Sequence, residues 1–213
     1  YVAGDFRTHP VGWFTLGLFA DHDAGAVETF VYMTLPLTDD LTEKLRARVD
    51  HWRDAAGLAK TELAQAIRAD GIDILVDMAG HTAENGLAAL AERPAPIQAV
   101  SGGVAGTTGV DAVDYILADR FEIPPGHERF YSESIVRLPD GYVCYTPPDY
   151  APAVVPLPAR AEGRVTFGCF NNIAKISPST VSLWARVLAA VPRARLLLKT
   201  FGFHDADNRA RYR

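Results

Sequence analysis

The sequence predicts an α/β protein with a mostly parallel, Rossmann-like sheet, followed by the beginning of a second Rossmann-like lobe. Two observations lead to this prediction. Short apolar or β-branched segments alternate with helical segments along the chain, which is typical of repeated βαβ units with helices on both faces of a sheet. A proline-rich stretch then interrupts the alternation at residues 139–158, and the pattern restarts near Gly163.

The first elements follow from composition. A strand is expected to end near Ala3, and residues 11–20 are apolar enough for a helix packed on a sheet. Residues 29–35 are β-branched and aromatic, as in a buried strand. Residues 41–53 alternate acids and bases, which predicts a helix with a solvated face.

The middle of the chain shows the βαβ pattern most clearly. Residues 61–69 have helical spacing and stop at Asp70 and Gly71, and residues 72–78 follow as an apolar strand. The remaining predicted elements here are a short helix at residues 88–91 and strands at residues 97–100 and 115–119.

The organisation expected from these elements is an N-terminal catalytic lobe at residues 1–138, an inter-lobe connector at 139–162 and the start of a second lobe at 163–213. In the second lobe, residues 165–170 read as a strand and Ser177-Pro178 as a helix start. The predicted inward face of that helix consists of Leu183, Trp184, Val187 and Leu188. The chain opens without Met and stops in a charged run, so a fragment of a longer protein is expected.

Composition narrows the class of function. The chain has 213 residues, is 48% hydrophobic and carries a formal charge of -5, which gives no broad electrostatic reason to bind nucleic acid. No apolar run reaches the ~18 residues of a membrane helix, and no leader is present, so a cytoplasmic protein is expected. Cys144 and Cys169 lack metal-ligand spacing and cannot form a disulfide framework.

The candidate functional residues lie in four loops that follow predicted strands, at residues 4–10, 79–82, 101–109 and 171–177. In doubly wound sheets, ligands bind outside the carboxyl ends of the strands, where such loops collect. The side chains there suit a polar, phosphate-bearing ligand better than a metal. A zinc site is rejected because no His or Cys cluster has the required spacing.

Two histidines are candidates in these loops. His9, in a strand-to-helix loop beside Pro10, can be held neutral at a helix N-terminus, ready to accept a proton. A capping or packing role explains His9 equally well from spacing alone. His81 has a weaker claim, because Asp77 and Thr82 could simply hold it in a turn.

Phosphate could be bound at two further loops. The glycine-rich run at residues 101–109, with Thr107 and Thr108, is neither a Walker loop nor a dinucleotide fingerprint, but its backbone amides could cradle phosphate or form a structural turn. Asn171, Asn172 and Lys175 precede a helix start, a natural pyrophosphate site; a lysine on a solvated loop is the alternative.

Several motifs in order resemble the catalytic region of the O-GlcNAc transferase/SPINDLY family. They are G-D-F-R-T-H-P (residues 4–10), D-G-I-D-I-L-V-D-M-A-G-H-T (70–82), R-P-A-P-I-Q-A (93–99), G-T-T-G (106–109), D-Y-I-L-A-D (114–119), Y-S-E (131–133), L-P-D-G-Y (138–142) and F-N-N-I-A-K-I-S-P-S-T (170–180). Together they cover nearly the whole chain, and the combination of R-P-A-P-I-Q with G-T-T-G is specific.

The resemblance implies a GT-B fold and an inverting, metal-independent transfer of a sugar, with UDP-GlcNAc as the expected donor, to Ser or Thr hydroxyls of an acceptor protein or peptide. It places His9 at the active site, Lys175 against the leaving diphosphate, and Asn172 beside it as a polar contact. Apart from the nucleotide sugar, which is a substrate, no cofactor is expected. Tetratricopeptide repeats usually precede this region in the family.

The sequence departs from the family in two respects. Where relatives carry W-L-G-Y-P, this chain has S-G-G-V-A at residues 101–105, which alters the loop beside G-T-T-G. The rest of the second lobe, with its nucleotide-binding H-T-T loop, is absent, so the isolated chain is expected to be inactive. The alternatives are a protein O-fucosyltransferase using GDP-fucose, transfer of glucose or another sugar, an inactive GT-B relic, and a non-enzymatic module that binds a phosphate ligand.

Overall fold

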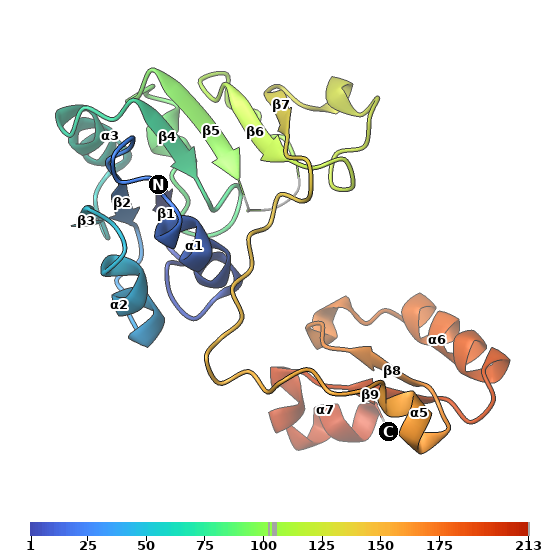
Figure 1. Cartoon of the computed structure of the whole chain (residues 1–213). Helices are drawn as coiled ribbons and strands as arrows, with labels where there is room; N and C mark the ends of the chain where they lie inside the picture. Colours follow the sequence, from blue (N-terminus) through green and yellow to red (C-terminus); the bar gives the residue numbers. More distant parts are fainter. Residues whose placement is uncertain (102, 104–105, 213) are drawn as a thin grey trace. The chain divides into compact units, whose positions relative to one another are not determined.

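The computed structural model describes residues 1–101, 103 and 106–212 and divides the chain into two compact units, Tyr1–Ala151 and Pro152–Arg213. The boundary between the units falls inside the stretch 139–162 that the sequence marks as a connector. Each unit has its own parallel sheet (Figure 1).

The first unit is built on a seven-stranded sheet in the order β3-β2-β1-β4-β5-β6-β7, and every described pairing in it is parallel. The strands are β1 (Val2–Ala3), β2 (Phe30–Met33), β3 (His51–Asp54), β4 (Ile74–Asp77), β5 (Ile97–Ser101), β6 (Tyr115–Ala118) and β7 (Ser134–Arg137). The helices are α1 (Pro10–Ala20), α2 (Asp40–Arg46), α3 (Lys60–Ala69), α4 (Leu87–Leu90) and the 3-10 turn η1 (Glu128–Phe130).

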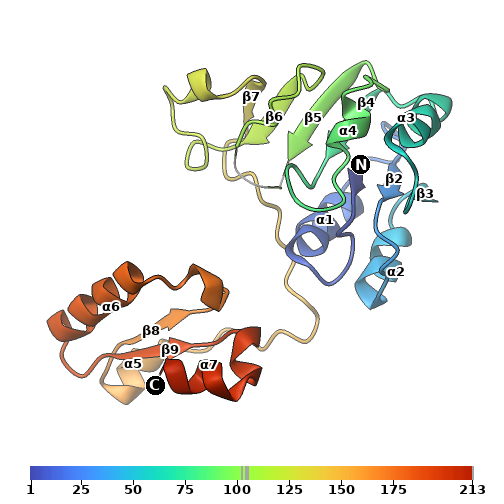
Figure 2. The same ribbon diagram turned by 180° about the vertical axis from the view of Figure 1, so that it is seen from behind.

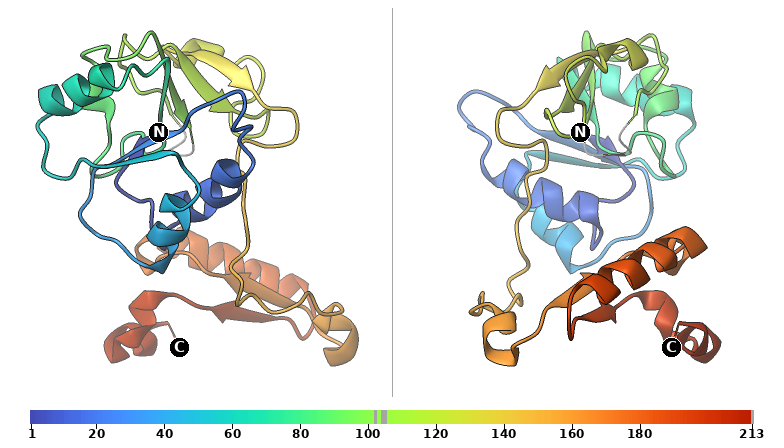
Figure 3. Two further views of the ribbon diagram at one scale, coloured as in Figure 1. Left: turned by 60° about the vertical axis from the view of Figure 1, so that its left-hand side comes forward. Right: turned by 90° about the vertical axis from the view of Figure 1, so that its right-hand side faces the viewer.

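Alternation along the strands creates two hydrophobic layers, one on each face of the sheet. Ala3, Val31 and Met33 belong to the cluster that contains the inward residues of α1 and α2. Their neighbours Val2 and Tyr32 belong to the cluster formed with α3 and α4. Successive side chains of a strand point to opposite faces, so a sheet covered on both sides needs apolar residues at consecutive positions. Figure 3 shows α1 and α2 packed side by side on one face.

The R-P-A-P-I-Q motif proves to be a structural clamp at the amino ends of β5 and β6. Arg93 adopts a left-handed backbone (φ 48°) and its guanidinium donates to the carbonyls of Ala112 and Pro96 and to Asp114. The fully buried Gln98 amide donates to Leu90 and Ala112 carbonyls. These bonds fix the turn that leads into β6.

The second unit is smaller, and none of its described side chains is fully buried. Its two parallel strands, β8 (Thr166–Cys169) and β9 (Arg195–Leu198), flank α6 (Pro178–Ala190) in sequence, as in a βαβ unit (Figure 2). The other elements are α5 (Pro158–Glu162), the 3-10 turns η2 (Ile173–Lys175) and η3 (Phe201–His204), and α7 (Ala206–Arg211).

Two sequence-based expectations are corrected by the structure, and one strand was not predicted. The helix predicted at residues 41–53 ends at Arg46 as α2, and its second half contains strand β3 instead. Strand β7 is unpredicted. Leu183, expected on the inner face of α6, is 53% exposed, whereas Trp184, Val187 and Leu188 are half-buried. The last residues of the predicted connector, 158–162, form the short helix α5.

Candidate active site

The strand order reverses between β1 and β4, and two candidate histidines follow these two strands. From β1 the chain moves outward to β2 and β3, whereas β4 starts the series that runs outward to β7 on the other side. The loop after β1 contains His9 and the turn after β4 contains His81. A reversal of this kind leaves a crevice at the carboxyl ends of the two strands, which is where doubly wound proteins bind their ligands.

His9 is the N-cap residue of α1. Its Nδ1 accepts a long hydrogen bond from the Val11 amide (3.4 Å) and lies 3.7 Å from Oδ2 of Asp5. Burial lowers the pKa of His9; the Asp5 charge opposes this shift and the Arg7 charge adds to it. The imidazole side chain is still 37% exposed, so a ligand can reach it. His9 is therefore held mainly neutral and accessible.

The hydrogen bonds of His9 determine which ring nitrogen carries the proton and which can accept one. An amide N–H can only donate, so in the state shown Nδ1 is the acceptor and the neutral ring carries its proton on Nε2. If the proton moves to Nδ1, facing Asp5, the lone pair appears on Nε2 instead. The Val11 amide thus favours a donating Nε2, whereas the Asp5 carboxylate favours an accepting one.

The loop that carries His9 is fastened to the beginning of α2. Asp39, the N-cap of α2, accepts from the Thr8 amide through Oδ2 (2.7 Å) and from the first turn of its own helix through Oδ1. The Thr42 hydroxyl donates to the Phe6 carbonyl (2.9 Å), and the Phe6 side chain is fully buried. These contacts define the backbone path from β1 to His9.

The turn that carries His81 is organised by Asp77. This fully buried carboxylate accepts from the amides of Ala79 (3.0 Å), Gly80 (2.5 Å) and Gly86 (2.8 Å). Burial nevertheless raises its pKa above the usual range, against the effect of these three donors. Asp77 therefore acts as the internal scaffold of the β4–α4 turn.

Thr107 and Thr108 lie beside the His81 turn, but their hydroxyls are engaged by Glu133. Glu133 accepts from Thr107 Oγ1 (2.8 Å), from the Thr108 amide (2.6 Å) and from Thr108 Oγ1. The carbonyl of Thr107 in turn lies 3.2 Å from Nε2 of His81. That these threonines contact substrate stays a prediction. The structure shows in addition that both are bonded to Glu133 and so help to fix their own loop.

Glu133 is a residue whose role the sequence did not reveal. It ends the Y-S-E motif just before β7, and its partners lie 25 and 26 residues earlier in the chain. The only sequence signal for Glu133 was its place in the Y-S-E motif. The fold shows that this residue is only 5% exposed and that its carboxylate faces the two threonines.

The altered loop at residues 101–105 falls largely outside the described residues, since Gly102, Val104 and Ala105 are not among them. Gly103 is described, and a Cβ at this position would lie 2.5 Å from the Ala79 carbonyl oxygen. Gly103 therefore has to be glycine for the β5 loop to lie against the turn that precedes His81.

The remaining candidates belong to the second unit and are described within it. Asn172 begins η2, and its side-chain oxygen accepts from the Ala174 amide (3.0 Å). Lys175 ends η2 and is exposed, as is Asn171. Ser177 then caps α6 by accepting from the Thr180 amide. Lys175 thus stands two residues before the capped N-terminus of a 13-residue helix, where backbone amides favour an anion.

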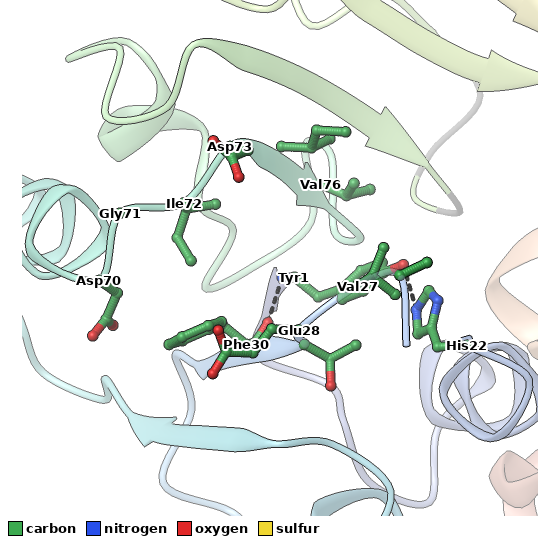
Figure 4. Close-up of a pocket in the computed structure, with 13 residues that line it drawn as sticks. Tyr1, His22, Val27, Glu28, Phe30, Asp70, Gly71, Ile72, Asp73 and Val76 are labelled. Atoms are coloured by element: carbon green, nitrogen blue, oxygen red, sulfur yellow. Dashed lines mark hydrogen bonds between the residues drawn. The ribbon is translucent and has the colours of Figure 1, made fainter. Parts of the chain in front are cut away.

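A hollow of about 430 Å³ lies at the opposite edge of the first sheet. It is formed around the residues that precede or begin β1, β2 and β4, including Tyr1, Phe30 and Ile74, and Figure 4 shows His22 hydrogen-bonded to the Tyr1 hydroxyl at its side. None of the predicted site residues lines it. Across the described part of the chain, no group of three or more His, Cys, Asp or Glu side chains is placed to hold a metal, and no helix is long and apolar enough to cross a membrane.

Comparison with known proteins agrees with this arrangement. Residues 1–146 match the model of glycosyl transferase family 41. The chain belongs to this family. The predicted family resemblance and α/β, GT-B type of fold are thereby confirmed, the latter also by a solved structure, a mutant of the Thermobaculum terrenum O-GlcNAc transferase. That structure is 42% identical, with a TM-score of 0.88 over 100% of this chain and 40% of its own.

Several curated proteins are similar to most or all of the chain. Proteins named probable UDP-N-acetylglucosamine–peptide N-acetylglucosaminyltransferase SPINDLY are 41% identical in Arabidopsis thaliana and 40% in Solanum lycopersicum, each over 100% of this chain. The Arabidopsis thaliana protein of the same activity name called SEC is 31% identical over 94%. The chain spans only 22% to 24% of the length of these relatives.

Proposed function

We propose that this chain is part of an inverting, metal-independent protein glycosyltransferase that moves N-acetylglucosamine from UDP-GlcNAc to Ser or Thr hydroxyls of a protein or peptide acceptor. The observation that most supports this is the neutral, accessible His9 at the carboxyl end of β1, at the reversal of a family 41 sheet. The relatives named as UDP-N-acetylglucosamine–peptide transferases support the choice of donor and acceptor.

The chemistry requires charge stabilisation at two places. A Ser or Thr hydroxyl attacks the anomeric carbon in line with the bond to the diphosphate; that bond breaks and leaves negative charge on the diphosphate. Lys175, with Asn171 and Asn172 beside it, would stabilise that charge together with the amides at the start of α6. The diphosphate is already charged in the bound donor and gains further charge as the bond breaks, so these groups would contribute both to donor binding and to kcat.

His9 would act at the acceptor end of the same reaction. With its proton on Nδ1 it can accept a hydrogen bond from the attacking hydroxyl at Nε2 and then take up the proton that this hydroxyl loses as its oxygen bonds to the anomeric carbon. With its proton on Nε2 it can donate to a sugar oxygen. His81, Thr107 and Thr108 would line the site next to it. Beyond the nucleotide-sugar substrate no cofactor is required, and we expect a cytoplasmic protein with tetratricopeptide repeats before this region.

The proposal is tested by donor binding to the full-length protein, measured by calorimetry with UDP-GlcNAc and with GDP-fucose. Saturable binding of UDP-GlcNAc that is weakened at least tenfold in Lys175→Ala supports the assignment; one lost charge-assisted contact of about 1.5–3 kcal/mol corresponds to a loss of that size. Lys60→Ala, an exposed lysine at the start of α3, is the matched control. If only GDP-fucose binds, the transferred sugar is fucose and not N-acetylglucosamine. If neither donor binds, the proposal is overturned.

The activity itself is tested by transfer of labelled sugar to a Ser/Thr peptide in the presence of a metal chelator. Unchanged turnover with the chelator and an inverted anomeric configuration in the product are expected. The isolated 213-residue chain is expected to show no turnover. Retention of configuration, or loss of turnover on chelation, would contradict the mechanism.

A further inference from the structure

Glu133, at the amino end of β7, forms a cluster of contacts that links the segments next to three strands of the sheet. It precedes β7, it holds the residues 107–108 that follow β5, and Thr107 contacts His81 in the turn after β4. The Thr107 hydroxyl also accepts from the amides of Ser132 (3.1 Å) and Gly109 (3.2 Å). The backbone around Thr107 is thus fixed from both sides.

The carboxylate of Glu133 is ionised although it is buried. Burial would raise its pKa, but the hydroxyls of Thr108 and Thr107 and the amide of Thr108 all donate to it and bring the pKa below the usual range. A charged acceptor makes hydrogen bonds about twice as strong as a neutral one. The arrangement therefore resists displacement of either threonine.

The consequence for His81 follows from the chemistry of its partner. The Thr107 carbonyl can only accept, so Nε2 of His81 must donate to it (3.2 Å). In a neutral imidazole the other nitrogen, Nδ1, then carries the lone pair. The position of the Thr107 carbonyl thus selects one tautomer of His81, and Glu133 determines the position of that carbonyl.

We propose that Glu133 is a positioning residue, which holds the Thr107–Thr108 backbone so that His81 is kept as the Nε2–H tautomer and presents Nδ1 as an acceptor for a substrate hydroxyl. The proposed transferase function enters only in the identity of the substrate hydroxyl, which would belong to the donor sugar or to the acceptor. The tautomer itself is a property of the folded chain and can be measured without substrate.

The first test is nitrogen-15 NMR of the histidine side chains of the 213-residue chain at a pH where His81 is neutral. Nε2 of His81 is expected to be protonated and Nδ1 unprotonated, and Glu133→Ala is expected to give a mixture of the two tautomers. Glu128→Gln is the matched control, because Glu128 lies in the same β6–β7 segment but is bonded to Arg137 and the Gly126 amide. A wild-type Nδ1–H tautomer, or a folded Glu133→Ala chain with the tautomer unchanged, overturns the proposal.

A second pair of variants covers the case in which Glu133→Ala does not fold. Thr107→Ser keeps the hydroxyl that donates to Glu133 and is expected to keep the tautomer, whereas Thr107→Val removes it and is expected to mix the tautomers. Equal behaviour of the two variants in the NMR measurement overturns the proposal.

Kinetics of the full-length protein separate this role from the transferase proposal. Glu133→Gln is expected to lower kcat on the order of 10- to 100-fold, with a smaller change in the KM for donor, because a misplaced group near the reacting atoms costs mainly turnover. If the tautomer behaves as expected but the wild type transfers no sugar, the function fails and the positioning stands. If the wild type transfers sugar and Glu133→Gln leaves kcat unchanged, the positioning role in catalysis fails.

Discussion

The carbonyl oxygen of Arg7 occupies the place that a side chain on Gly12 would need. A Cβ on Gly12 would lie 2.0 Å from that oxygen, far inside any real contact. The same carbonyl accepts from the His9 amide (2.6 Å), so the turn that delivers His9 folds tightly against the first turn of α1. Gly12 is thus tied to the position of the proposed catalytic histidine, although it contacts no ligand itself.

Gly12→Ala is expected to destabilise the chain by about 1–3 kcal/mol, because backbone rather than a side chain must move to relieve the overlap. It should also lower transfer activity in the full-length protein, since the loop to His9 shifts. Gly17→Ala on the same helix is the control: it gains the same helix propensity of about 1 kcal/mol but meets only side-chain atoms of Thr146 and Cys144. Urea unfolding of both variants checks this, and a Gly12→Ala chain as stable as Gly17→Ala would contradict it.

The hydrogen bonds of Asp70 are expected to make the free energy of unfolding depend on pH. Arg53 donates to both of its oxygens and the Tyr32 hydroxyl adds a third bond (2.7 Å). The hydrogen bond from Arg53 is the largest effect and lowers the pKa of Asp70 below its ordinary 3.8. A carboxyl with a depressed pKa stabilises the fold above its unfolded-state pKa and loses that contribution as the pH falls through its folded-state pKa, which here means below about pH 4.

Asp70→Asn is therefore expected to lower the free energy of unfolding by about 1–3 kcal/mol at pH 7 and by less at pH 3. Denaturant unfolding at the two pH values measures the difference. Asp73→Asn, three residues further along, is the control, since no side-chain hydrogen bond or ion pair to Asp73 is present among the described residues. A loss that is equal at both pH values would show that the charge of Asp70 is not the cause.

The elements that the sequence predicts well and those it misses differ in burial. Strands β2 and β4 pair with a neighbour on each side, and helix α3 buries one apolar face, so the apolar pattern of all three is dense and local. The two missed strands, β3 and β7, are the edges of the sheet; β3 is H-W-R-D, in which only the tryptophan is apolar. An edge strand is held by backbone bonds to one neighbour, and backbone bonds leave no trace in side-chain composition.

The same reasoning applies to the site. His9 and Lys175 are visible from the sequence because each stands in a loop between a strand and a helix start, which is a local pattern. The function of Glu133 depends on Thr107 and Thr108, which reach it only after β5, β6 and β7 have paired. The R-P-A-P-I-Q motif identifies the family but has a structural role. Arg93 donates to the carbonyls of Pro96 and Ala112 at the amino edge of the sheet, opposite the edge at which His9 lies.

Arg93→Lys separates that structural role from a role in catalysis. The guanidinium makes bonds to two carbonyls and to Asp114 (2.8 Å), which a single ammonium cannot reproduce. We expect a loss of about 1–2 kcal/mol in the free energy of unfolding and an unchanged Kd for UDP-GlcNAc in the full-length protein. A tenfold weaker Kd in a folded variant would contradict the structural assignment.

The pH profile of transfer is expected to report on His9. Burial lowers the pKa of His9 below its ordinary 6.5, so the neutral ring persists to more acidic pH than in a free histidine. If the neutral form is required, kcat/KM of the full-length protein stays on its plateau below pH 6.5 and falls as the pH decreases through the lowered pKa, because kcat/KM follows the ionisation of the free enzyme.

Two neighbours allow this limb of the profile to be moved in opposite directions. The Asp5 charge raises the pKa of His9 and the Arg7 charge lowers it, and these two side chains are 2.8 Å apart. Asp5→Asn is therefore expected to shift the acidic limb to lower pH, and Arg7→Gln to shift it to higher pH. His9→Asn keeps a capping side chain at the start of α1 but cannot titrate, so its residual activity should lack the limb. Shifts of both charge variants in the same direction, or a limb that persists in His9→Asn, would assign the titration to another residue.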